Sequence, residues 1–185
     1  MSSFSPRTTA PSTTDLNWIT VGYGGYNKCI NIANGSVLPN CTGYVHGRWI
    51  EISGYTQETG LSLGNASSYY GHTSDGYTRS SEPSLGACIC FSGGAGHVRV
   101  VEEIASDSSY IVCSESNYGG SRFIMRTRYR ANNWRLSGSS VTFQGFIVNP
   151  WVSDTPPEPQ PAAEKNMFMI LAAKKLMSNR NGGIS

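Results

Sequence analysis

Hydrophobic residues recur at three- to four-residue intervals between residues 41 and 52, and this spacing predicts a helix packed on another layer. The apolar stripe consists of Cys41, Val45, Trp49 and Ile52. The same helical period turns Thr42, His46 and Glu51 outward. We therefore expect one buried face and one polar face.

A proline and an asparagine mark the start of this helix. Pro39 fixes φ, and Asn40 is a favoured N-cap because its side chain can accept a bond from an unpaired backbone N–H group. Cys41 then falls in the first turn, where the helix dipole and the unpaired N–H groups favour a thiolate. Cys41 is a candidate nucleophile, but it could equally be a small buried hydrophobic residue. Position alone leaves both interpretations open.

Later stretches have the composition of strands, and segments rich in glycine and serine separate them. The predicted strands cover residues 85–91, 97–104, 110–118 and 141–148. The second and third are joined by a short polar segment, which predicts an antiparallel hairpin with its turn near Ser106 and Asp107. Residues 53–84 are polar and rich in turns, and we expect at most one short helix there, around residues 65–70.

The hairpin brings polar residues together at one end. Pairing that is symmetric about residue 106 places His97 directly opposite Glu115, and strand alternation puts Asn117 on the same face as Glu115. A register shift of one residue would move them to opposite faces. The geometry therefore supports a site that combines these three residues, provided the register holds.

Three arginines alternate in the stretch FIMRTRYRANNW, which predicts one basic face of a sheet. They are Arg126, Arg128 and Arg130. Such a face is either simply solvated or a surface for an anionic polymer.

The chain divides by texture into four parts. The composition predicts an extended N-terminal arm over residues 1–16 and one domain, large enough for a catalytic site, over residues 17–150. A stiff proline-rich linker is predicted over residues 151–163. Residues 164–185 predict a short apolar helix and a flexible end. The helical part, residues 164–178, needs a surface to cover, which could be its own domain, a second copy in self-association, or a membrane.

Composition excludes several classes of function. A net charge of +2 over 185 residues is too small to indicate nucleic-acid binding, and no stretch has the length and hydropathy of a transmembrane segment or a signal peptide. The 5 cysteines are an odd number, which argues against a complete disulfide framework. Cys88 and Cys90 share a strand face, but without a second ligand pair we expect no metal site and no cofactor.

A cysteine at a helix start, a histidine at a strand start and a carboxylate–amide pair on the next strand form a papain-like arrangement. The motifs LPNCTGYVHGRW, PSLGACICFSGGAGHVRVVEEI and SESNYGG, in this order, resemble a CHAP domain, the cysteine- and histidine-dependent amidohydrolase/peptidase of bacteriophage lysins. The resemblance covers about residues 7–150 and also includes RANNWRLSGSSVTFQGFIVNP. It implies an α+β, papain-like fold in which the N-terminal helix carrying the cysteine packs on an antiparallel sheet carrying the histidine and Glu/Asn.

The resemblance implies a role for each site residue. Cys41 corresponds to the nucleophile, His97 to the base, Glu115 to the group that orients the imidazole, and Asn117 to an auxiliary polar residue. His46, about 140° around the helix from Cys41, cannot easily face the thiol, and His72, in an exposed loop, is the fallback base.

The implied activity is hydrolysis of an amide bond in the peptide of peptidoglycan by a phage lysin, made in the host cytoplasm and acting on the wall after release. Amidase and endopeptidase activity would use the same residues. The alternatives are a virion-associated or bacterial wall-remodelling module and a non-catalytic wall-binding domain.

Two departures from the family pattern stand out. Residues 27–40 contain no Asp or Glu, so the calcium loop of some members is not expected here. Arg99 stands where a small apolar residue is usual.

Overall fold

The computed structural model describes residues 4–11, 40–116, 123–135 and 140–153. All of them lie in the first of two units, Met1–Asp154, and the second unit is Thr155–Ser185. The predictions for Asn117 and for residues 164–178 fall outside the described residues. In the part of the chain that is described, no helix has both the length and the apolar character to cross a membrane.

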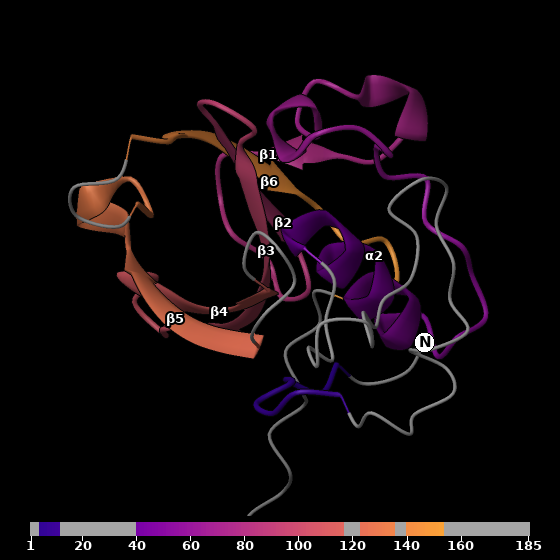
Figure 1. Ribbon diagram of the computed structural model, residues 1–185. Coiled ribbons are helices and arrows are strands. Elements are labelled where there is room, and N and C mark those ends of the chain that lie inside the picture. The colour runs from indigo at the N-terminus through magenta and orange to yellow at the C-terminus, as the bar shows by residue number, and fades with distance from the viewer. Residues whose placement is uncertain (1–3, 12–39, 117–122, 136–139, 154–185) are drawn as a thin grey trace, which may run out of the picture. The chain divides into compact units, whose positions relative to one another are not determined.

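The predicted helix is α2, Cys41–Ile52, and it begins at the predicted cap (Figure 1). The Asn40 side-chain oxygen accepts a hydrogen bond from the Gly43 N–H at 3.1 Å and from the Thr42 hydroxyl at 2.7 Å. Asn40 thereby satisfies a backbone donor that the first turn of a helix cannot pair internally. The cap places Cys41 at the first helical position.

The expected outward face of α2 is wrong for two of its three residues. His46 is 2% exposed and Thr42 5% exposed, whereas Glu51 is half-buried. The chain that follows the helix folds back over this face, where Ser62 O lies 3.2 Å from His46 Nε2 and Thr59 Oγ1 contacts His46 Nδ1. Tyr69 adds an edge-on ring contact to His46 at 6.1 Å. α2 is therefore buried on two sides.

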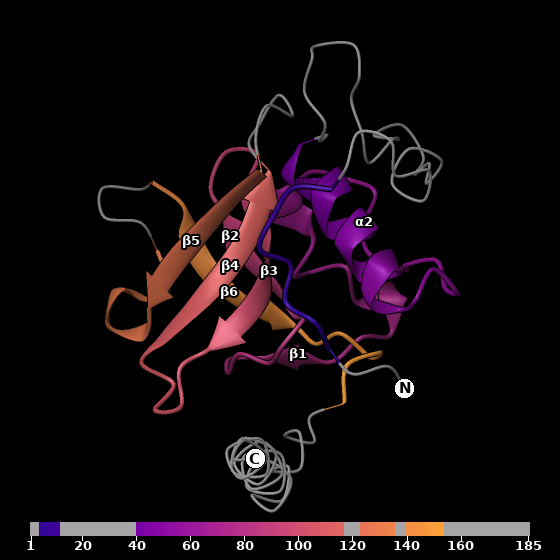
Figure 2. The same cartoon turned by 90° about the horizontal axis from the view of Figure 1, so that it is seen from below.

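One antiparallel sheet of six strands, ordered β1-β6-β2-β3-β4-β5, forms the other layer (Figures 1 and 2). The strands are β1 Arg79–Ser80, β2 Cys88–Ser92, β3 His97–Ile104, β4 Tyr110–Ser116, β5 Phe123–Tyr129 and β6 Thr142–Ile147. With α2 packed on the sheet, the α+β fold with a cysteine-bearing helix is confirmed.

Some elements differ from the prediction. β2 begins at Cys88 rather than at residue 85, because a turn closes first: the Ala87 N–H bonds Ser84 O, and Gly86 has a φ of 72°. Within residues 53–84 the structure has a short edge strand, β1, and two 3₁₀ helices, Ala66–Ser68 and Thr73–Asp75, where at most one helix was expected.

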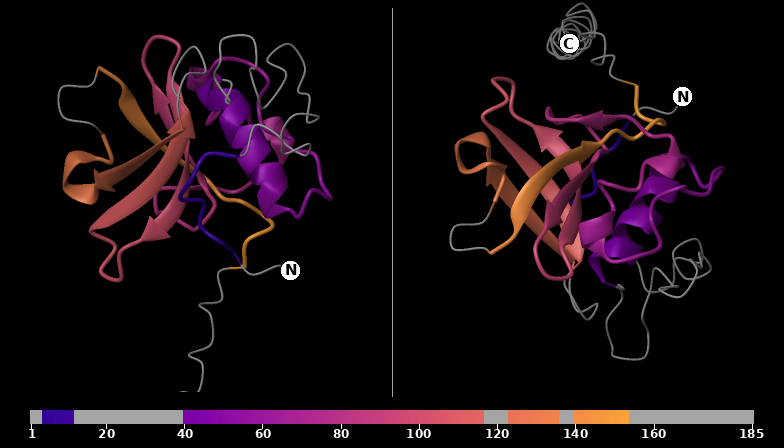
Figure 3. Two further views of the ribbon diagram at one scale, coloured as in Figure 1. Left: turned by 60° about the horizontal axis from the view of Figure 1, so that its bottom comes forward. Right: turned by 90° about the horizontal axis from the view of Figure 1, so that it is seen from above.

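Both faces of the central strands are buried. Cys88, Cys90, Val98 and Val100 face α2, in a cluster with Val45 and Trp49. The alternating residues of the same strands enter a second cluster on the other face, which contains Ile89, Phe91, Val101, Ile111, Trp134 and Phe146. The sheet is curved, and α2 lies on its convex side (Figure 3), so the second cluster fills the concave side. This double burial explains why β2 is apolar at every position from Cys88 to Phe91.

A β-bulge in β3 ties the sheet to the helix. The register between β3 and β4 shifts between Val101 and Glu103, so Glu102 is the additional residue. Its buried carboxylate accepts bonds from Arg48 Nε and Nη2, both at 2.9 Å, and from Ser114 Oγ at 2.6 Å. A fork-to-fork pair of this kind fixes the angle between α2 and the sheet.

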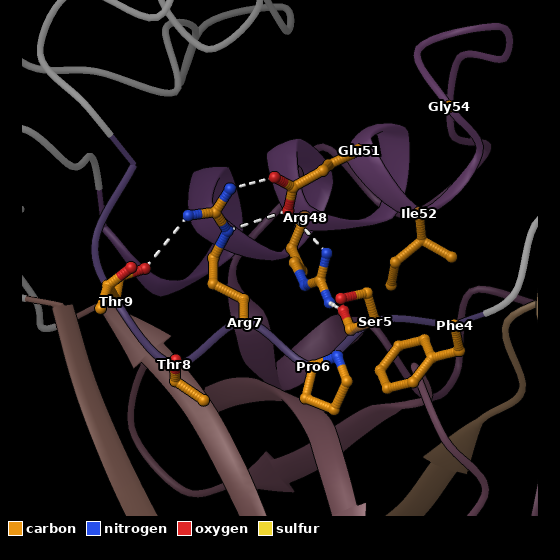
Figure 4. A pocket seen from close by; sticks show the side chains of 10 residues that line it. All are labelled: Phe4, Ser5, Pro6, Arg7, Thr8, Thr9, Arg48, Glu51, Ile52 and Gly54. Carbon is orange, nitrogen blue, oxygen red and sulfur yellow. Dashed lines mark hydrogen bonds and ion pairs between the residues drawn. The ribbon is translucent and has the colours of Figure 1, made fainter. Parts of the chain in front are cut away.

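Residues 4–11 form a strap that runs alongside α2, with Phe4 near Ile52 at the C-terminal end of the helix and Thr9 toward its start (Figure 4). The Arg7 N–H bonds Glu102 at 2.9 Å, Arg7 Nε bonds Glu51 at 2.9 Å, and Arg48 Nη2 bonds Ser5 O at 2.6 Å. Strap and helix enclose a pocket of about 430 Å³. The α2 residues that line this pocket, Arg48, Glu51 and Ile52, lie about 10–16 Å from Cys41 along the helix axis.

Replacing Arg48 by methionine is expected to lower the free energy of unfolding by about 3–5 kcal/mol, because Glu102 would keep a buried charge without its main partner. Urea denaturation followed by circular dichroism measures the change. Arg130→Met is the control, since its ion pair with Glu82 is exposed and should have little effect. Equal stability of the two variants would contradict the role assigned to Glu102.

Candidate active site

Three residues from separate elements meet at one end of the sheet. Cys41 is the first residue of α2, His97 the first residue of β3, and Glu115 the next-to-last residue of β4. The start of α2 and the end of β4 lie on the same side of the domain (Figure 2). The structure thus brings together the predicted cysteine, histidine and glutamate, while Asn117 lies outside the described residues.

The predicted pairing of His97 directly opposite Glu115 is wrong. Val100 pairs with Ser114 and Val101 with Cys113, so the same register continued places Glu115 opposite Arg99, two residues from His97. A two-residue shift keeps every side chain on its face, because the strand period is two. His97 Nε2 consequently still reaches Glu115 Oε2, along a diagonal, and forms a hydrogen-bonded ion pair when the ring is protonated.

The thiol of Cys41 interacts with the imidazole of His97. Burial by itself raises the pKa of Cys41, but the hydrogen bond and charge of His97, together with the backbone N–H groups of Val98 and Thr42, bring this pKa below its ordinary value. Burial lowers the pKa of His97, but Cys41 and Glu115 outweigh burial and raise this pKa. Since Glu115 occupies Nε2, Nδ1 is the ring nitrogen left for the thiol. Both shifts favour a thiolate–imidazolium pair.

The other buried cysteines have a different environment. Burial raises the pKa of Cys113 to about 12 and that of Cys88 well above its ordinary value. Cys41 is also buried, at 8% exposure, so it is both a core residue and a thiol whose pKa is lowered. The Cys88 and Cys90 sulfurs lie 3.8 Å apart, and no group of three or more His, Cys, Asp or Glu side chains suited to a metal is found among the described residues.

The remaining histidines lie elsewhere. His46 is buried, and burial lowers its pKa to about 4 despite the bond to Ser62 O. His72 is half-buried rather than exposed and contacts Ser74 Oγ at 3.3 Å. Neither takes the place of His97.

Glu115 is the centre of a cluster of positive charge. Arg99 Nε lies 2.7 Å from Oε2, whereas Arg128 Nη2 and Arg126 Nε lie 3.3 Å and 3.8 Å from Oε1. Burial of Glu115 raises its pKa, but His97 and the arginines outweigh it and lower this pKa. Arg128 is buried, and burial together with the charge of Arg99 lowers its pKa to about 10.

This cluster corrects the prediction of one basic sheet face. Arg126 has a 48% exposed side chain, but that of Arg128 is 1% exposed and turned to Glu115. Arg130 lies beyond β5 and pairs with Glu82 at 2.7 Å. Arg126, Arg128 and Arg130 therefore do not form a single solvated surface.

Sequence reasoning missed Arg99 and Arg128 as partners of Glu115. Strand alternation already placed Arg99 on the face of His97, and that signal could have identified it. The burial of Arg128 had no local signal. The calcium question concerns residues 27–40, of which only Asn40 is described.

Comparison with known proteins places this geometry in a family. Residues 31–117, which include Cys41, His97 and Glu115, match the CHAP domain family profile. The chain contains a CHAP domain. Among solved structures, N-acetylmuramoyl-L-alanine amidase from Staphylococcus aureus is similar, with a TM-score of 0.46 and 28% sequence identity over 60% of this chain and 30% of that chain. No curated protein matches the sequence.

The CHAP thiol should react with iodoacetamide well below the ordinary cysteine pKa of about 8.5, because thiolate persists to lower pH beside an imidazolium. The measurement is the alkylation rate of Cys41 against pH, followed by peptide mass spectrometry, with Cys113 as an internal control. Cys113 should stay unreactive in the folded protein. A profile for Cys41 that follows an unperturbed thiol would contradict the ion pair.

Proposed function

We propose that this chain is a peptidoglycan hydrolase that cleaves an amide bond of the wall peptide through an acyl-enzyme on Cys41. The observation that carries the proposal is the contact chain from Cys41 to His97 to Glu115 at a capped helix start. The CHAP match over residues 31–117 supports it independently.

In the first step, the Cys41 thiolate attacks the carbonyl carbon of the scissile amide and a C–S bond forms. The backbone N–H of Cys41, at the first position of α2, stabilises the negative oxygen. The C–N bond then breaks, and the His97 imidazolium gives its Nδ1 proton to the leaving amine. Neutral His97 next takes a proton from water, which attacks the thioester; the C–S bond breaks, the acid is released, and the Cys41 thiolate is restored beside the His97 imidazolium.

Glu115 serves this cycle from the other side of the ring. Its carboxylate holds Nε2–H and thereby fixes both the tautomer and the orientation of the imidazole. It makes and breaks no covalent bond. Asn117 is proposed as an auxiliary polar residue beside it.

Mass spectrometry of fragments released from purified cell walls tests the proposal. Cleavage at the glycan–peptide junction would release peptides that begin with L-alanine, whereas cleavage within the peptide or cross-bridge would release shorter peptides. Either pattern supports the hydrolase, because the same residues serve both. Equal release by the parent protein and Cys41→Ala would overturn it.

Within this class we propose a phage lysin that acts on the wall after release from the host cytoplasm. The support is the sequence likeness of the three motifs to lysins. Lysis of whole cells by externally added protein would agree with this role. Co-purification with a large viral or cell-wall assembly would instead favour a virion-associated or remodelling module.

A further inference from the structure

Arg99 shares an oxygen atom with His97. Its Nε donates to Glu115 Oε2 at 2.7 Å, and this is the oxygen that His97 Nε2 also contacts. Arg128 approaches the other oxygen, Oε1, at 3.3 Å. Both carboxylate oxygens of Glu115 thus have an arginine partner, and Oε2 is shared between Arg99 and His97.

Stability alone does not account for an arginine at this position. Arg99 is 6% exposed, and its buried Nη1 has no hydrogen-bond partner among the described residues. A buried unpaired donor costs about 1–3 kcal/mol, which an apolar side chain beside Phe91 would avoid. The guanidinium is also one of three positive arginine charges around one carboxylate.

We propose that Arg99 is a positioning residue of the candidate active site, which fixes Glu115 Oε2 beside His97 and limits the share of its negative charge that the imidazole receives. The proposal rests on the thiol mechanism above but not on the identity of the substrate.

The expected consequence has a definite sign. The charge of Arg99 opposes protonation of His97 and so acts to lower the pKa of the imidazole. Without Arg99, Glu115 Oε2 would interact with His97 alone, and the imidazolium would persist to higher pH. The Glu115 carboxylate would also lose the arginine that holds Oε2 in place. Misplacement of a catalytic group by about 1 Å can cost roughly a hundredfold in rate.

The experiment compares Arg99→Met with Arg128→Met. Both remove a buried guanidinium from Glu115, but only the first removes the partner at Oε2. Two readouts are taken: kcat and KM on soluble wall fragments, and the pH titration of the His97 ring followed by NMR. The titration needs no substrate, so its result stands even if peptidoglycan is not the substrate.

For Arg99→Met we expect kcat to fall roughly tenfold to a hundredfold with little change in KM, and the His97 titration to move to higher pH. Arg128→Met should shift the titration less. Arg99→Lys, which keeps the charge, should return the titration to the parent value while kcat recovers only in part.

A purely structural role would lower the melting temperature and the active fraction but leave the His97 titration in place, and this result would overturn the proposal. A shift in Arg128→Met as large as that in Arg99→Met would also overturn it. If Arg99→Met does not fold, Arg99→Lys decides, because a kcat equal to the parent value would show that the Nε bond is not needed.

Discussion

Cys41→Ala is expected to reduce turnover of cell-wall substrate by roughly 10⁴-fold or more, because no other group can form the acyl-enzyme. The fold should persist. Cys41 lies at the start of the helix and is small, so its truncation should cost only about 1 kcal/mol of stability. Turbidity clearing of purified walls and thermal melting measure the two effects separately.

The control for this variant is Cys113→Ala. Cys113 is a fully buried thiol on the other face of the sheet, with a pKa raised to about 12. Its removal should lower stability while leaving kcat near the parent value. Clearing by Cys41→Ala at a tenth of the parent rate would be incompatible with an obligatory thiol.

His97→Ala is expected to lose at least about a thousandfold in kcat, for two reasons that act together. The leaving amine would receive no proton from the enzyme, and Cys41 would lose the interactions with His97 that lower its pKa. The alkylation profile of Cys41 should therefore move to higher pH in the same variant. This second readout separates loss of the base from general damage.

Two other histidines serve as controls for His97. His72→Ala should retain turnover, because His72 contacts Ser74 in a loop outside the site. His46→Ala should lose stability, because His46 is buried against Ser62, but should keep the pH profile of Cys41. Retained activity in His97→Ala would show that another base operates and would refute the assignment.

Local signals were sufficient for the helix and its cap. The Asn40 cap depends on a bond to Gly43, three residues away, so neighbouring residues determine it. The burial of His46 could not be predicted in the same way, because its cover comes from Thr59 and Ser62. Which face of a helix is buried depends on the path of the whole chain.

The hairpin shows what strand periodicity can and cannot predict. Its register depends on where the turn closes and on the bulge at Glu102, and neither has a distinct local signal. The predicted face of His97 and Glu115 nevertheless held, because the error was an even number of residues. Alternation predicts which side chains share a face better than it predicts which ones are opposite.

The arginines show the limit of reasoning from a pattern of charge. Alternation placed Arg126 and Arg128 together, but a buried acceptor, Glu115, draws Arg128 inward. That carboxylate is on the neighbouring strand. Whether a charged side chain is solvated therefore depends on pairing across strands that the sequence of one strand does not contain.

The strap also has a consequence for the order of folding during synthesis. Arg7 bonds Glu102, which is 95 residues later in the chain. The ribosome therefore exposes the N-terminal arm long before its acceptor exists, and the arm can dock only after β3 has been made. A strap outside the sheet can open locally while the sheet stays paired, so native-state hydrogen exchange should show the Arg7 amide exchanging through a local opening that leaves β3 closed.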